Sequence, residues 1–99
     1  MKHLPNERAV LVTHDVGLHA RPSVKLTKLA KTFEAEIMIR TEGDANGWID
    51  AKSIVKVMAL RIGAGEILVI RAEGSDAHAA VDALAGLVER DFDEARVDG

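Results

Sequence analysis

The chain has 99 residues, which suits one domain with one core and is too short for two. Charged residues make up 29% and hydrophobic residues 47%, a composition typical of globular domains, and no apolar run approaches the roughly 20 residues that span a bilayer. The absence of cysteine excludes disulfides and thiolate zinc sites. A net charge of -3 and few aromatic residues argue against a nucleic-acid partner. Because the N-terminus is too short and polar for a secretory signal, we expect a cytoplasmic protein without membrane insertion.

The first half of the chain predicts a strand, a helix and a hairpin. Residues 8–14 are rich in Val and Leu, as strands are. Residues 20–33 have the spacing of an amphipathic helix, with a buried stripe formed by Leu26, Leu29, Ala30 and Phe33. Residues 34–40 alternate as a half-buried strand and residues 48–50 return as a third, so the pair predicts a hairpin.

The second half predicts a short helix, a strand and a longer helix. Residues 51–63 form a compact apolar segment that Ser53 opens and Gly63 closes. A strand follows at 66–74, and the spacing from Ser75 to Arg90 is helical with Ser75 as the N-cap. The order β-α-β-β-α-β-α predicts an α+β domain, with three helices on one face of a four-stranded antiparallel sheet. We expect one domain over residues 1–99, with its core at about 7–90 and a short polar C-terminal tail.

The entrance of the first helix has the features of an anion site. His19 stands where the helix begins, and Pro22 fits the first turn because amides there have no intrahelical acceptors. Those amides, the helix dipole and the Arg21 guanidinium would hold phosphoryl oxygens, and a neutral imidazole is a competent nucleophile. These residues alone leave open that His19 is an ordinary residue at a helix start.

Four basic residues and no acidic one lie between Arg21 and Lys31. At about 100° per residue, Arg21, Lys25, Lys28 and Lys31 share one side of the helix, with Ala20 and Val24 beside them. An apolar centre with a basic rim suits docking of an acidic protein. The alternative is a solvated lysine face.

The segments "GLHARPS" and "AKSIVKVMAL" together resemble HPr, the histidine phosphocarrier of the phosphoenolpyruvate-dependent phosphotransferase system. The resemblance covers roughly residues 7–90 and implies an open-faced β-sandwich. It implies a carrier without a cofactor, which is acted on by enzymes and is not itself one. His19 would accept a phosphoryl group on Nδ1 from enzyme I and pass it to the A component of an enzyme II or to a regulatory counterpart.

The resemblance also assigns roles to individual residues. It makes His19 the phosphorylated nucleophile and Arg21 the stabiliser of the phosphoryl oxygens. The family's docking patch corresponds to Ala20, Val24, Ile54, Val55 and Met58, with Lys28, Lys31 and Lys56 around it. Because this surface must stay free for partners, we expect a monomer.

Ser53 corresponds to the serine that an HPr kinase/phosphorylase modifies in many bacteria. A phosphate there would add negative charge to a surface that meets acidic partners. The simpler alternative is that Ser53 only caps a helix. A rival function is therefore a regulatory binding module controlled by Ser53 phosphorylation, or the carrier of a nitrogen-related branch without sugar transport.

Two positions depart from the family pattern, and a few other residues are assigned no chemistry. Val16 replaces a polar residue near the imidazole, and Arg61 replaces a frequent glycine. His3, His14 and His78 lack metal-ligand spacing, so no metal site is expected, and Trp48 is interpreted as core or hairpin packing.

Overall fold

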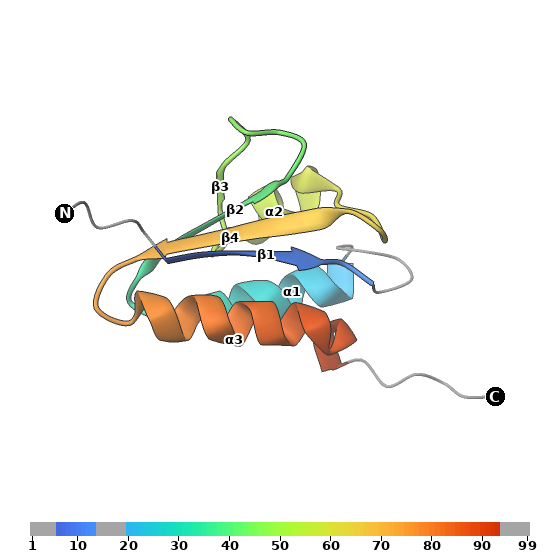
Figure 1. Ribbon diagram of the computed structural model, residues 1–99. Coiled ribbons are helices and arrows are strands. Elements are labelled where there is room, and N and C mark those ends of the chain that lie inside the picture. The colour runs from blue at the N-terminus through green and yellow to red at the C-terminus, as the bar shows by residue number, and fades with distance from the viewer. Residues whose placement is uncertain (1–5, 14–19, 94–99) are drawn as a thin grey trace.

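A computed structural model describes residues 6–13 and 20–93. The elements follow the predicted order, with one added 3-10 turn (Figure 1). In chain order they are β1 (Asn6–Leu11), α1 (Ala20–Ala30), β2 (Glu36–Thr41), β3 (Ile49–Asp50), α2 (Ile54–Leu60), β4 (Ile67–Glu73), α3 (Ala77–Glu89) and η1 (Asp91–Asp93).

The four strands form one antiparallel sheet in the order β1-β4-β2-β3. Helices α1 and α3 lie along one face of it in Figure 1, and α2 packs against α1 and β3. The predicted open-faced α+β sandwich is therefore confirmed. Because β4 is central, it pairs on one side with β1, where Val10 faces Leu68, and on the other with β2, where Ile39 faces Ile70.

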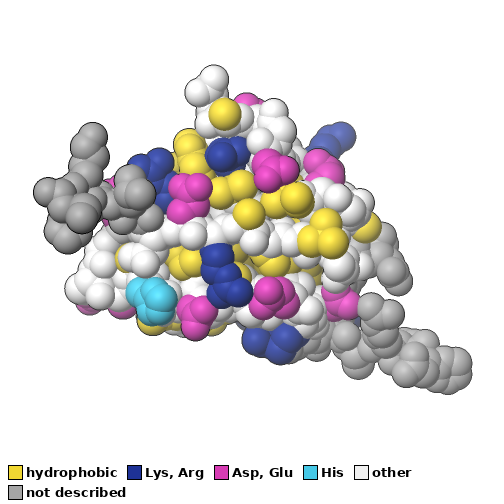
Figure 2. Space-filling model, viewed as in Figure 1, with side chains coloured by type: hydrophobic (Ala, Val, Ile, Leu, Met, Phe, Trp, Pro, Cys, Tyr) yellow, Lys and Arg dark blue, Asp and Glu magenta, His cyan; other side chains and the backbone are white. Residues whose placement is uncertain are grey.

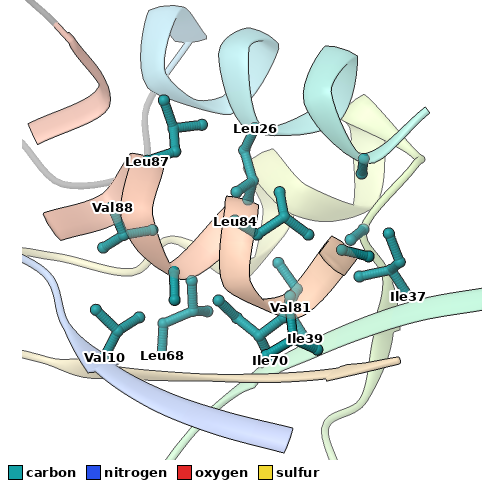
Figure 3. Close-up of a cluster of buried hydrophobic side chains, with 14 of the residues drawn as sticks. Val10, Leu26, Ile37, Ile39, Leu68, Ile70, Val81, Leu84, Leu87 and Val88 are labelled. Atoms are coloured by element: carbon teal, nitrogen blue, oxygen red, sulfur yellow. The ribbon is translucent and has the colours of Figure 1, made fainter. Parts of the chain in front are cut away.

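The core lies between the sheet and the two longer helices (Figure 3). Alternate residues of β2 and β4 point toward the helices, so Ile37, Ile39, Leu68 and Ile70 are fully buried. They meet Leu84 of α3 and Leu26 of α1. Full burial of such side chains stabilises the fold by about 1.5–3 kcal/mol each, which makes this cluster the scaffold that holds α1 in place.

Two elements in the first half end earlier than predicted. The strand predicted at 8–14 runs from Asn6 to Leu11; Val12 instead exchanges backbone hydrogen bonds with the turn at Gly65 and Glu66. The helix predicted to reach Phe33 ends at Ala30. The Thr32 hydroxyl donates to the Leu29 carbonyl at 2.7 Å, a local bond that competes with helix continuation.

Two predicted helix ends in the second half were wrong. Helix α2 is closed by Arg61, not Gly63, because Arg61 takes the left-handed conformation (φ 52°) and its amide donates to the Met58 carbonyl. Helix α3 is preceded by Asp76 as the N-cap residue, not Ser75. The Asp76 carboxylate makes no capping bond, because it accepts hydrogen bonds from the amides of a distant segment.

On the side of the molecule seen in Figure 2, hydrophobic side chains lie between charged ones. Trp48 is half-buried and outside the core, with the Arg40 guanidinium carbon 4.9 Å and that of Arg71 5.6 Å from its ring centre. Of the two predicted placements, core or hairpin packing, the structure has the second, through cation–π contacts. Within residues 6–13 and 20–93, none of the helices combines the length and the apolar character needed to traverse a bilayer.

Candidate functional site

The first candidate element of the site is the start of α1. Helix α1 begins at Ala20, and its first turn contains no acidic residue. Pro22 is fully buried and anchors this turn, whereas Arg21 is exposed. The first-turn amides have no intrahelical acceptors, so this end of α1 can bind an anion. His19, which precedes Ala20 in the sequence, and Val16 lie outside the described residues.

Helix α1 is buried on one side and exposed to solvent on the other. Leu26 and Ala30 have no exposed surface, and Ser23 and Thr27 are buried on the same side. The opposite side keeps Arg21, Val24, Lys28 and Lys31 exposed. The amphipathic pattern therefore aims a mixed apolar and basic face at solvent.

Helices α1 and α2 pack together and bring two distant segments onto one surface. On it, Val24 is 40% exposed, Met58 41% and Val55 75%. Ile54 is half-buried, and Lys56 is exposed. We call the set Val24, Ile54, Val55 and Met58, with Lys28, Lys31 and Lys56, the α1–α2 surface. Ala20 belongs to α1, but its side chain is outside the described part.

Ser53 stands at the start of α2 as its N-cap residue. Its backbone is extended (φ -103°, ψ 110°), and its Oγ accepts a hydrogen bond from the Lys56 amide at 3.3 Å. The side chain is only half-buried. The structural role that the sequence left as an alternative is therefore present, and the hydroxyl is accessible beside the α1–α2 surface.

Lys25 differs from the other basic residues of α1. It is half-buried, and its Nζ donates to the Phe92 carbonyl at 2.9 Å. The helical wheel placed it on the basic face, but the tertiary structure turns it toward η1. The turn η1 was not predicted from the sequence, although Leu84, Val88 and Phe92 continue an i, i+4, i+8 pattern past the end of α3.

Asp76 ties the other end of α3 to β2. Its carboxylate accepts hydrogen bonds from the Glu34 amide at 2.9 Å and the Ala35 amide at 2.8 Å. The Glu34 amide is the main cause of a pKa below the ordinary value of 3.8; the Ala35 amide and the charge of Lys52 act in the same direction, and desolvation opposes them. Asp76 is thus a structural carboxylate that joins α3 to the approach to β2.

The remaining histidines and acids form no second site in the part of the chain that the structure describes. His78 is exposed on α3, while His3 and His14 lie outside the described residues. Within the described residues, no three His, Asp or Glu side chains gather as metal ligands would. The α1 entrance and the α1–α2 surface are therefore the candidate site.

A family model described as the PTS HPr component phosphorylation site matches residues 6–90. The match includes both segments that form the candidate site, the start of α1 and the whole of α2.

Curated relatives and solved structures agree with this match. The chain is 40% identical to phosphocarrier protein NPr of Shewanella violacea over 90% of this chain and 94% of that protein. It is 38% identical to phosphocarrier protein HPr of Cupriavidus necator over 89% and 96%. The crystal structure of HPr-C-His from Thermoanaerobacter tengcongensis superposes with a TM-score of 0.83 at 31% identity, covering 92% of this chain and 99% of that one.

Proposed function

Because this chain belongs to the HPr family of phosphocarriers of the phosphotransferase system, and is a carrier rather than an enzyme, we propose that His19 is its phosphoryl acceptor. The lone pair of Nδ1 attacks phosphorus while the bond between phosphorus and enzyme I breaks. The phosphoryl group then leaves His19 for the A component of an enzyme II or a regulatory counterpart. No cofactor takes part.

The proposal is supported by the sequence, in which His19 directly precedes Ala20, the first residue of α1. The first turn contains no acid, and Arg21 is exposed beside it. Backbone donors and a guanidinium together favour the three phosphoryl oxygens in both the resting and the transferring state. Such fixed donors stabilise developing charge without reorganisation.

The proposed docking site for enzyme I and for acceptors is the α1–α2 surface, with Ala20 at its edge. Its exposed Val24, Val55 and Met58 form an apolar centre, and the lysines around them suit acidic partners. Exposed lysines speed encounter more than they strengthen the complex, which fits a carrier that must bind and leave repeatedly.

The test is transfer of labelled phosphate from phosphoenolpyruvate by enzyme I. Wild type should be labelled, with an acid-labile bond, and His19→Ala should not. His78→Ala is the matched control, because His78 is exposed on α3 and away from the site, and it should be labelled normally. Acid-labile phosphate on His19→Ala would overturn the assignment, provided that circular dichroism shows an intact fold.

The acceptor defines two candidate roles. The relatives include both an HPr and an NPr, so sugar transport and a nitrogen-related regulatory branch are both compatible with the family. The 40% identity to the NPr of Shewanella violacea favours testing the regulatory branch first. Offering labelled carrier to A components of both branches separates the two roles by their relative transfer rates.

Ser53 is the proposed regulatory site. A phosphate on its Oγ would add about two negative charges at the start of α2, next to the lysines that meet acidic partners. An HPr kinase/phosphorylase with ATP should label wild type and not Ser53→Ala. Ser53→Asp keeps a capping side chain and adds charge, so it should weaken transfer from enzyme I without unfolding the protein.

We infer that the protein is a cytoplasmic monomer. The monomer follows from its function, because a carrier that meets several partners through one surface must keep that surface free of other copies. Light scattering at micromolar concentration checks the oligomeric state. A stable dimer that covers Val55 would contradict it.

A further inference from the structure

The turn η1 follows α3 in an unusual backbone conformation. Asp91 and Phe92 have φ values of 54° and 61°, in the left-handed region. Two consecutive residues other than glycine are uncommon there, and a bulky aromatic is an outlier. Such conformations persist only where surrounding contacts fix them, and they cluster at functional sites.

Contacts made by both of these residues hold the turn. The Phe92 side chain has no exposed surface and packs in the core. Its carbonyl accepts the hydrogen bond from Lys25 Nζ at 2.9 Å. Asp91 Oδ1 accepts a hydrogen bond from the Thr13 hydroxyl at 2.6 Å.

The partners of the turn lie on both sides of segment 14–19. Thr13 is the last described residue before this segment, and Lys25 lies on α1, which begins directly after it. The chain leading to Thr13 is also fixed, because the Val12 amide donates to Glu66 O at 2.9 Å and the Gly65 amide donates to Val12 O at 2.8 Å. The turn η1 therefore links the two ends of the segment that contains His19.

From this arrangement we propose that η1 positions His19 for phosphoryl transfer, with Asp91, Thr13, Phe92 and Lys25 as positioning residues. The inference rests on the proposed function. Transfer requires the imidazole nitrogen to stand in line with phosphorus, and a misplacement of about 1 Å can cost on the order of a hundredfold in rate. By joining β1 to α1, the turn fixes the distance and angle between the two ends of the segment.

The test removes one contact and leaves the docking surface intact. Thr13→Val deletes the hydroxyl at nearly constant volume, and Thr13→Ser restores it. Thr32→Val is the matched control, because the Thr32 hydroxyl is also exposed and donates a 2.7 Å hydrogen bond, but to Leu29 O at the far end of α1. For each variant, the measurements are kcat and KM as the substrate of enzyme I, the hydrolysis rate of the phosphohistidine, and the midpoint of urea unfolding.

We expect Thr13→Val to lower kcat about fivefold, consistent with loss of one exposed charged hydrogen bond, with KM within about twofold of wild type. Its phosphohistidine should hydrolyse at a changed rate. Thr13→Ser should return kcat and the hydrolysis rate toward wild type, and Thr32→Val should leave both unchanged. Equal kcat and hydrolysis rate in Thr13→Val and wild type would overturn the inference, whatever the unfolding midpoint. Failure of the proposed function itself would appear separately, as absence of labelling in the wild-type arm.

Discussion

The two ends of α3 are fastened in the same way but at different conformational cost. At its start, Asp76 accepts hydrogen bonds from Glu34 and Ala35 at the approach to β2. At its end, Asp91 accepts a hydrogen bond from Thr13 at the end of β1. In both places an aspartate outside the helix joins α3 to a distant segment. The bonded residues are 42 and 41 positions apart at the start of α3 and 78 positions apart at its end.

The difference lies in the backbone beside each aspartate. Before α3, the positive φ of 140° falls on Gly74, which adopts it without strain. After α3, positive φ falls on Asp91 and Phe92, at a cost of about 1–2 kcal/mol for each residue. The strained end is the one that contacts Thr13 and Lys25, which lie before and after the segment containing His19 in the sequence. If η1 positions His19 as we propose, the strain is retained at the end of α3 that has this role.

The largest expected effect comes from removing the residue that offsets the strain. Phe92→Ala should lower the free energy of unfolding by about 4 kcal/mol, because it leaves a cavity in the core and removes the buried side chain that anchors the left-handed turn. Urea denaturation measures this. Phe33→Ala is the comparison, because Phe33 is only partly buried and should cost less. A loss below about 1 kcal/mol for Phe92→Ala would show that the turn is not held by this side chain.

The segment before α3, where Gly74 avoids strain, should not tolerate a side chain at position 74. A Cβ on Gly74 would lie 2.9 Å from Ala35 Cα, and its φ of 140° is unfavourable for alanine. We expect Gly74→Ala to cost about 3 kcal/mol in unfolding free energy. Gly43→Ala is the control, since no atom lies within 4 Å of its Cβ position, and it should change stability by less than about 0.5 kcal/mol. Equal effects of the two substitutions would contradict the close approach.

A smaller effect is expected from the Asp76 carboxylate, and it depends on pH. The pKa of Asp76 is below its ordinary value of 3.8 in the folded protein, mainly because of the Glu34 amide. Its contribution to stability is therefore complete above 3.8 and is lost as pH falls through the lower folded value.

Asp76→Asn should thus be less stable than wild type at pH 7, and the gap should close in acid. Asp82→Asn serves as the control, because Asp82 forms an exposed ion pair with Arg8 at 2.9 Å and such pairs contribute little. Urea midpoints between pH 7 and strongly acidic pH measure both. A gap that persists unchanged in acid would show that the charge of Asp76 is not responsible.

The smallest expected effect is an increase in the free energy of unfolding. Arg61 is left-handed and exposed at the end of α2, without the burial that stabilises Phe92. Replacing it with glycine should raise the free energy of unfolding by about 1 kcal/mol, because glycine adopts this φ without steric cost. Arg61→Ala is the control, since it removes the charge but keeps the Cβ, and it should not produce the gain. Thermal melting compares the three proteins.

The local sequence pattern was sufficient to predict the helices and strands and the buried side of α1. The spacing of Leu26 and Ala30 predicted the buried side of α1, and Ser53 was recognised as the residue that opens α2. The motif around His19 indicated the family. These features depend on neighbours within one or two turns of helix, which is the range that periodicity and capping describe.

The ends of the helices, and the hydrogen bonds that hold the two ends of α3, could not be predicted from the local pattern. Ser75 was a sound N-cap from its type, yet the helix begins after Asp76, whose carboxylate is engaged by residues that the sheet brings close. The spacing of Leu84, Val88 and Phe92 signals the burial of Phe92, but not that its carbonyl accepts a hydrogen bond from Lys25.

By itself, the sequence therefore determined the order of helices and strands, the buried face of each, and the family. Only the tertiary structure decided which distant residues became partners, among them Thr13 with Asp91 and Lys25 with Phe92. The physical reason is that side-chain periodicity encodes burial over a few residues, whereas a hydrogen bond across 78 positions forms only after the whole sheet and both long helices have packed.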